Sequence, residues 1–240
     1  METIYNEIRK RALDIIDRDL LDKKVKIKAR ALSPEEAIGN PESDDYPLIK
    51  GRERLMQADL ESSSGQAFTD QYGNFEGYLR DILESEPVNN YKRAILIASL
   101  NAALKHMELI RGTTHCKDEE PAECAVQLAK HIESVYGKSR IIQIGFQPRF
   151  VEELAKTCEL RVIDLDIDNI GTTKFNTLIE GPEKTDEAVN WADLLLVTGT
   201  TITNGTIEIF LGKKPVLFYG ITISGAAYLM DWDRFCYKGR

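Results

Sequence analysis

The eleven residues from Thr114 to Cys124 carry the densest set of reactive side chains in the chain, with one histidine, two cysteines and four acids. Thiolate and imidazole groups bind zinc, copper, nickel or iron, and carboxylates widen that choice. The cysteines are not spaced as a C-x2-C pair, which argues against a structural zinc site. In the competing interpretation the acids stabilise the start of a helix and Cys124 packs in a core. The candidate metal ligands are His115, Cys116, Asp118, Glu119, Glu120 and Cys124.

A second candidate site follows a predicted strand over residues 140–144. Gly145 would let a ligand approach the backbone, next to Phe146. A helix predicted from Pro148 would offer free N–H groups to an anion at the edge of the sheet. Because the sequence lacks the pattern G-x-G-x-x-G, it does not predict a dinucleotide site of the usual kind. The alternative is an ordinary tight turn between a strand and a helix.

Asp164 ends the next predicted strand and lies 19 residues after Gly145, close to the spacing of acids that bind ribose. Asp166 and Asp168 follow at a period of two, so all three would share one face if the strand continued. Together they could bind ribose hydroxyls or a hard cation. The alternative is a solvated strand end.

The third candidate site is the segment from Thr198 to Thr206, with five threonines and two glycines in nine residues. Hydroxyl groups and backbone amides in front of a helix predicted over 203–211 would suit an oxyanion or a phosphate. Helix capping alone would need only one such residue. The candidate ligand-binding residues here are Thr200, Thr201, Asn204, Gly205 and Thr206, and Gly220 is added from the end of the last predicted strand.

In the first part of the chain, helices are expected to outnumber strands. Residues 33–60 are polar and rich in turns, and only Val25–Ala29 alternates as a strand does. A helix from Asn89 or Asn90 to Ile110 is apolar nearly all round and should be buried. The other predicted helices cover 4–16, a short capped segment from Ser33, a segment ending near Pro87, and 121–136, which stops at Gly137.

From Ser139 onward apolar strands alternate with helices, which predicts a parallel sheet covered on both faces. The fold class is therefore α/β, with a Rossmann-like doubly wound sheet preceded by an α+β region. We place the domains at 1–136 and 137–240. The predicted strands are 140–144, 160–164, 193–197 and 215–219.

Charge and composition exclude several classes of protein. The 240 residues carry a formal net charge of −8, which does not favour binding to nucleic acid. The longest apolar stretch, Ala94–Leu104, is too short to span a bilayer, and the first residues lack a secretory core. Four cysteines without such a leader indicate a reducing compartment. We expect a cytoplasmic protein without membrane or nucleic-acid partners, and a homodimer by analogy with most such proteins.

Several strings resemble a family of prokaryotic proteins described as "putative heavy-metal chelation". The resemblance implies an enolase-N-terminal-like domain followed by a Rossmann-like domain, with a shared site between them. It also implies that the cysteine-containing loop, the Thr-rich segment and Gly145 lie near one another. The strings that carry it are Ser33–Gly39, Pro47–Glu53, Gly65–Asp70, His115–Pro121, Thr198–Thr206 and Phe218–Ala227.

Two functions follow as hypotheses. In the first, the cleft between the domains binds a transition or heavy metal, or a small molecule that carries one, and Cys236 adds a ligand from near the C-terminus. In the second, the Rossmann-like half binds S-adenosylmethionine or a nucleotide as part of an enzyme. Its acid–base groups would come from Lys50, Glu53 or Glu120. The sequence leaves open whether any reaction is catalysed.

Overall fold

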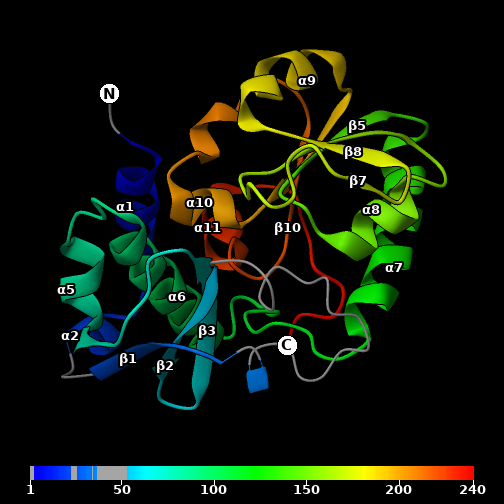
Figure 1. Cartoon of the computed structure of the whole chain (residues 1–240). Coiled ribbons are helices and arrows are strands. Elements are labelled where there is room, and N and C mark those ends of the chain that lie inside the picture. Colours follow the sequence, from blue (N-terminus) through cyan, green and yellow to red (C-terminus); the bar gives the residue numbers. More distant parts are fainter. Residues whose placement is uncertain (1–2, 23–25, 34, 37–52) are drawn as a thin grey trace.

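A computed structural model describes residues 3–22, 26–33, 35–36 and 53–240, and it contains two β-sheets joined through one long helix (Figure 1). The first sheet is antiparallel, in the order β3-β2-β1-β4. The second is a seven-stranded sheet in the order β11-β10-β9-β5-β6-β8-β7. In Figure 1 the first sheet is coloured blue to cyan and the second green to red, and they occupy separate parts of the molecule.

The first sheet has more strands than the sequence predicted. Strand β1 (Lys26–Ala31) was expected, but β2 (Arg54–Leu60), β3 (Ser63–Thr69) and β4 (Phe75–Tyr78) were not. Strands β2 and β3 form a hairpin that turns at Glu61, where φ is 51°. Their polar residues alternate with small apolar ones, so the pattern is weak in sequence although most of the apolar side chains are buried. The prediction that residues 33–60 are rich in turns was therefore wrong for residues 54–60.

Helix α6 (Asn90–His106) packs on this sheet and was predicted as a buried helix. The Asn89 side chain accepts a hydrogen bond from Lys92 N–H and begins the helix. It ends at His106 rather than at Ile110, because Glu108 adopts φ 58° and Leu109 N–H reaches back to the Leu104 carbonyl. The last four predicted residues therefore form a closing turn.

The contact between β3 and α6 is backbone against backbone. A Cβ atom on Gly65 would lie 2.2 Å from Ala102 N and 2.3 Å from the Ala98 carbonyl oxygen. No residue with a side chain fits there without moving the strand off the helix. On the other side α6 contacts α10 (Thr200–Asn204) and α11 (Ser224–Met230) of the second half.

Asn101, on α6, is fully buried and joins the two halves. Its amide group lies within hydrogen-bond distance of the carbonyl oxygens of Gln66, Ile221 and Thr222, at 2.9, 3.2 and 3.1 Å. Its side-chain oxygen accepts a hydrogen bond from Gly225 N–H at 2.7 Å. One side chain thus satisfies backbone groups of β3, of the segment after β10 and of α11.

The second sheet has the strand order typical of a Rossmann fold. Six of its strands run parallel, and numbered along the chain they lie in the order 6-5-4-1-2-3. They are β5 (Arg140–Ile144), β6 (Glu159–Ile163), β8 (Thr177–Glu180), β9 (Leu194–Thr198), β10 (Val216–Tyr219) and β11 (Arg234–Phe235). Antiparallel β7 (Thr173–Lys174) forms one edge. The predicted Rossmann-like sheet is confirmed.

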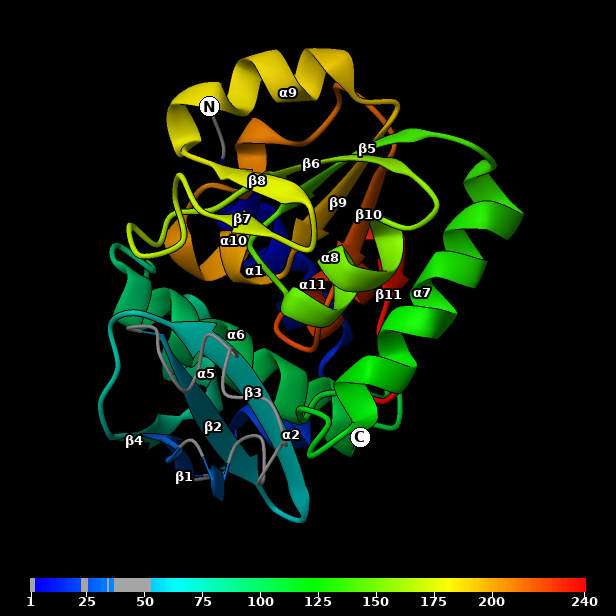
Figure 2. The same ribbon diagram turned by 45° about the vertical axis from the view of Figure 1, so that its right-hand side comes forward.

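Both faces of this sheet are buried, which explains its continuous apolar strands. Leu194 and Leu196 pack with α7 (Glu120–Tyr136) and α8 (Pro148–Leu154), which lie on the same side in Figure 2. Leu195 and Val197 belong to the core that contains α6 and α9 (Thr185–Trp191). Helix α7 therefore packs on the second sheet, and the division of domains at residue 136 stays a prediction.

Around these elements the chain adds short helices. Helix α1 (Ile4–Ile15) reaches the second half, where Tyr5 donates a hydrogen bond to the Ile202 carbonyl. Helices α2 (Arg18–Asp22) and α5 (Leu79–Glu84) pack beside it, and 3-10 turns cover Pro182–Lys184 and Ile207–Ile209. None of the helices in the described ranges has the length and hydropathy needed to span a membrane. The cytoplasmic location and the homodimer stay predictions.

We predict that Asn101→Ala lowers the free energy of unfolding by about 3 kcal/mol or more, since it leaves several buried backbone groups without partners. Urea unfolding followed by circular dichroism measures this change. Asn190→Ala, on the exposed face of α9, is the control and should change the stability little. Equal midpoints for the two variants would contradict the role given to Asn101.

Candidate functional site

A cavity of about 1060 Å³ opens at the carboxyl ends of β5, β6, β9 and β10. This is the edge where the strand order of a doubly wound sheet reverses and where such folds bind ligands. The first half of the chain contributes Glu53, Phe68, Asp70, His115 and Cys116 to its wall. The cavity is therefore lined by residues of both halves.

The cavity brings together most of the candidate residues. Gly205, Asp118, Glu119 and Glu120 are not among the described residues that line it, and Lys50 lies outside the described residues. The candidates that do line it are Glu53, His115, Cys116, Cys124, Gly145, Phe146, Asp164, Thr200, Thr201, Asn204, Thr206 and Gly220, together with Cys236.

Glycines keep the strand ends open to the cavity. Gly145 has φ 85°, and a Cβ atom there would lie 2.8 Å from Thr198 Cγ2. A Cβ atom on Gly199 would lie 2.8 Å from Ile223 N. Gly220 has φ 92°, a backbone conformation that side chains rarely tolerate. The ends of β5, β9 and β10 thus bring bare backbone to the cavity wall.

Asp164 follows β6 and turns its carboxylate into the loop after β5. One oxygen accepts Phe146 N–H at 2.5 Å, and the other accepts Asp166 N–H at 2.6 Å. Burial raises the pKa of Asp164, and these two N–H donors act in the opposite direction. The carboxylate is held in one orientation and still has lone pairs to offer a ligand.

The three acids after β6 do not share one face of a strand, because β6 ends at Ile163. Instead, the Asp164 carboxylate accepts Asp166 N–H, and the Asp166 carboxylate accepts Asp168 N–H at 3.1 Å. Asp164 and Asp166 therefore each fold the backbone that follows them into a turn. Only Asp164 and Asp166 reach the cavity.

The Thr-rich segment is helical rather than a loop. Helix α10 begins at Thr200 and ends at Asn204, and the next residue, Gly205, has φ 76°. The single helix predicted over 203–211 was therefore wrong: the helix starts earlier, and it stops before the 3-10 turn at Ile207–Ile209. Thr201 donates its hydroxyl to the Thr198 carbonyl, and Thr203 donates to the Phe68 carbonyl. These hydroxyls bind protein backbone. The Asn204 side-chain oxygen, by contrast, is buried without a hydrogen-bond partner at the cavity wall.

The opposite end of the cavity is lined by sulfur. Burial raises the pKa of Cys116 and of Cys124, and nearby Cys236 contributes to both shifts. The thiols are therefore protonated at neutral pH. His115 Nδ1 lies 2.5 Å from the Cys116 carbonyl oxygen, and burial lowers the pKa of its ring. Its ring packs edge-on against Phe68 at 5.4 Å between centroids.

The acids beside this loop have other partners. Glu120 accepts Lys117 N–H at 2.8 Å and pairs with Arg240 at 2.8 Å, which lowers its pKa. It thereby ties the start of α7 to the loop before it and to the C-terminal segment, in line with the structural interpretation of these acids. Within the described part of the chain, no three histidine, cysteine or acidic side chains are arranged to hold a metal ion. The donors line one cavity without forming a ready metal site.

Glu53 is the carboxyl group of the cavity with the largest described shift in pKa. It lies just before β2, and burial raises its pKa to about 7. The charges of Asp164, Asp70 and Asp166 contribute to this rise, although less than burial does. A carboxyl group with such a pKa can either give or accept a proton at neutral pH.

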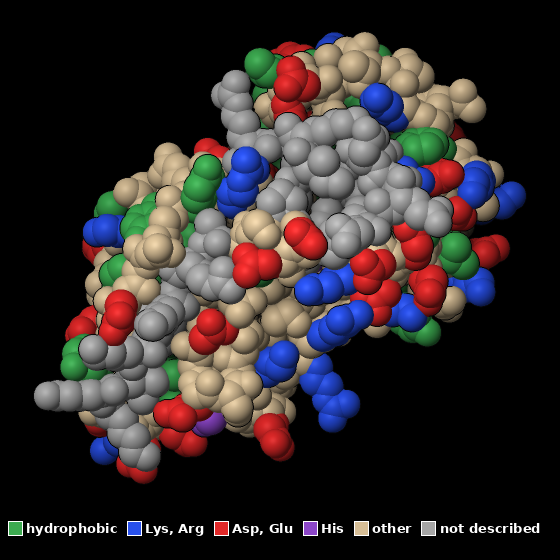
Figure 3. Space-filling view, turned by 60° about the horizontal axis from the view of Figure 1, so that its bottom comes forward, with side chains coloured by type: hydrophobic (Ala, Val, Ile, Leu, Met, Phe, Trp, Pro, Cys, Tyr) green, Lys and Arg blue, Asp and Glu red, His purple; other side chains and the backbone are tan. Residues whose placement is uncertain are grey.

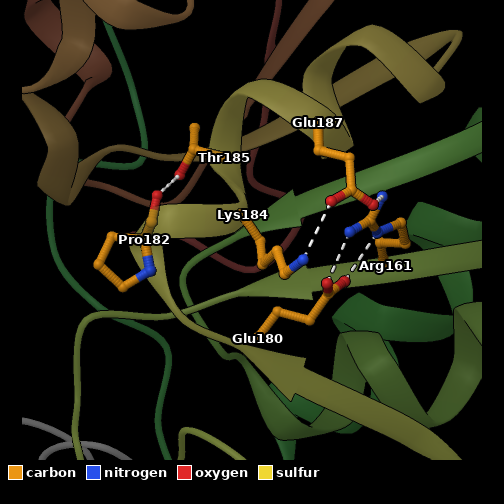
Figure 4. A network of polar contacts seen from close by, with 6 residues as sticks. All are labelled: Arg161, Glu180, Pro182, Lys184, Thr185 and Glu187. Carbon is orange, nitrogen blue, oxygen red and sulfur yellow. Dashed lines mark hydrogen bonds and ion pairs between the residues drawn. The ribbon is translucent and has the colours of Figure 1, made fainter.

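Two exposed apolar side chains lie at the outer rim of the cavity, and the wall next to them is held by hydrogen bonds and ion pairs. Leu165 and Ile167 line it and remain 58% and 72% exposed. The neighbouring wall at Pro182 and Thr185 is fixed by the network in Figure 4. There Arg161 binds both carboxylate oxygens of Glu180, at 2.7 and 2.6 Å.

Sequence reasoning did not select several lining residues. Asp70 comes from the end of β3, a strand that was not predicted. Tyr219 donates its hydroxyl to the carbonyl oxygens of Ile144 and Gly145, at 3.0 and 2.7 Å, and so braces the Gly145 turn. The only signal for either residue was its place in a string that carries the family resemblance.

The raised pKa of Glu53 gives a prediction for stability. Between about pH 4.5 and 7 the folded protein binds this proton more tightly than the unfolded chain, so the stability lost to the buried charge grows as the pH rises. Glu53→Gln should therefore gain stability over the wild type across this range, by up to about 3 kcal/mol. Urea unfolding at a series of pH values measures the difference. Glu133→Gln, exposed on α7, should run parallel to the wild type.

The structure has relatives of known fold. A protein of unknown function from the DUF364 family of Pyrococcus horikoshii shares 16% identity and a TM-score of 0.57, over 92% of this chain and 80% of that chain. One from Desulfitobacterium hafniense, of the same family, shares 11% identity and a TM-score of 0.59, over 95% and 82%. At these identities the likeness shows the fold alone.

No curated protein matches the sequence. A family model described as "putative heavy-metal chelation" matches residues 127–229, which run from α7 to α11. The resemblance first indicated by the sequence strings is thereby confirmed: over residues 127–229 this chain matches the DUF364 family.

Proposed function

We propose that the cavity binds a small organic molecule of the nucleoside class, in which vicinal hydroxyl groups pair with Asp164. The observation that carries this proposal is the Asp164 carboxylate, oriented by Phe146 N–H and Asp166 N–H at the end of the second parallel strand. In doubly wound folds, an acid at this position accepts hydrogen bonds from ribose hydroxyls. Gly145 beside it leaves room for the ligand to approach the backbone.

The rest of the cavity supports the same class of ligand. A volume of about 1060 Å³ is ample for a molecule of that size. Leu165 and Ile167 would cover one face of a flat ring, which explains why large apolar side chains are left exposed at this rim. If the protein is an enzyme, Glu53 is the residue we assign to proton transfer at the bound molecule.

We predict that Asp164→Asn weakens binding of adenosine by about 10- to 100-fold, because the amide cannot accept from the hydroxyl pair as a carboxylate does. Isothermal titration calorimetry measures this effect. Asp168→Asn, whose side chain lies outside the cavity lining, is the matched control and should bind like the wild type. 2′,3′-Dideoxyadenosine, which lacks the vicinal 2′- and 3′-hydroxyl groups, should bind the wild type as weakly as adenosine binds the variant. Equal affinities of the wild type for adenosine and dideoxyadenosine would refute the role of Asp164.

A second candidate function is capture of a soft metal ion as cargo. It is favoured by the fact that Cys116, Cys124, Cys236 and His115 line one cavity, and by the description of the family model. The described side chains do not form a preformed metal site, so they would have to move to bind one ion. Because burial keeps the thiols of Cys116 and Cys124 protonated, metal binding at these two residues would also have to release protons.

Under this second candidate, the Cys116→Ser, Cys124→Ser double variant loses a metal that the wild type retains when it is purified anaerobically without chelator. Native mass spectrometry detects the loss, and Cys158→Ser, outside the cavity, is the control. The affinity of the wild type should rise ~10-fold per pH unit for each thiol proton released. An unchanged metal content in the double variant would exclude these ligands.

A further inference from the structure

The charge of the cavity wall narrows the class of ligand. We infer that the bound molecule carries a positively charged group, such as an ammonium or a sulfonium, and is not a nucleotide phosphate. This inference rests on the proposed function, since it takes the cavity to be the ligand site. It follows from the side chains that line the cavity and from what is present to balance their charge.

The lining is strongly acidic. Among the described residues that line the cavity, seven are acids and one, Lys213, is a lysine or arginine. On the outer face shown in Figure 3, by contrast, acidic and basic side chains lie side by side. The net charge of the chain therefore does not explain the excess of acidic residues in the cavity lining. The seven acids are Glu53, Asp70, Asp164, Asp166, Glu183, Asp186 and Glu208.

Two described lining residues could carry a positive charge, Lys213 and His115, and they do little to balance the negative charge of the acids. Lys213 lies at the edge, with a side chain that is 49% exposed and 3.9 Å from Asp186. His115 is the described histidine of the cavity, and burial lowers the pKa of its ring, so it is neutral at pH 7. A phosphate bound here would meet several carboxylates and no buried cation from the described residues.

The acids also act on one another inside the cavity. The charges that most affect Glu53 are those of Asp164, Asp70 and Asp166, all of the same sign. The charges of Asp164 and Glu53 in turn raise the pKa of Tyr219. Glu53 comes from the first half of the chain and Asp164 from the second. A cation between them would relieve this repulsion and would attract both halves at once.

The helix that would otherwise favour an anion does not offset this charge. Helix α10 spans five residues, and the hydroxyls of Thr201 and Thr203 already bind backbone carbonyls. The partnerless acceptor there, the Asn204 side-chain oxygen, is suited to a donor rather than to a phosphate oxygen. Each of these features favours a ligand that brings donors or positive charge.

The experiment compares three adenine ribosides that share the base and the 2′,3′-hydroxyl pair and differ only at the 5′ position. They are adenosine, adenosine 5′-monophosphate and 5′-amino-5′-deoxyadenosine, whose amine is protonated at neutral pH. Their affinities for the full chain are measured by calorimetry in the presence of a chelator. We expect the amine to bind at least ~10-fold more tightly than adenosine, and the monophosphate at least ~10-fold more weakly.

The outcomes separate this inference from the function on which it rests. If the monophosphate binds as tightly as adenosine or more so, the inference is overturned and the nucleoside site stands. If it does so only with excess magnesium chloride, the positive charge belongs to a metal ion and the organic cation is overturned. If dideoxyadenosine binds as well as adenosine, or no nucleoside binds, the proposed function fails and the inference with it.

A variant locates the effect within the cavity. Glu53→Gln removes one carboxylate that faces Asp164 and should reduce the preference for the amine over the monophosphate by about threefold or more. Glu133→Gln also removes one carboxyl group but lies on the exposed face of α7, and it should leave that preference unchanged. Equal reductions in the two variants would assign the preference to overall charge and overturn the role of the cavity.

Discussion

The structure depends on one buried amide. Asn101 is fully buried on α6, and its four polar contacts reach the antiparallel sheet, the segment after β10 and the start of α11. Both halves of the chain pack on α6, so this helix can be apolar nearly all round and still bury Asn101. Because that residue satisfies backbone groups in both halves, it fixes how the two sheets meet.

The position of the cavity follows from that junction. The doubly wound sheet brings Gly145, Asp164 and Gly220 to one edge, as its strand order requires. The antiparallel sheet and the loop after α6 supply the opposite wall, with Glu53, Asp70 and the thiols. Neither half alone contains the site. The acidic wall and the sulfur-lined end therefore exist only because α6 holds the halves together.

The second half could be predicted well because its signals are local. Short, mostly apolar runs predicted the strands and placed Gly145 and Asp164 at the carboxyl ends of two of them. Helix α7 was also predicted at both ends, since Pro121 suits a first turn and Gly137 has φ 67°. The Thr-rich segment misled because hydroxyl groups suit a ligand and a backbone carbonyl equally.

By itself the sequence determined the Rossmann-like sheet and the buried central helix, and it named several of the residues that line the cavity, because period and composition report which faces are buried. Only the tertiary structure decided that β2 and β3 are strands, since their partners lie across a hairpin and on α6. It also decided that Glu53 faces Asp164 and that Glu120 faces Arg240. Charges 111 residues apart (164 − 53) have no pattern in sequence, and only the packing of two sheets on one helix brings them together.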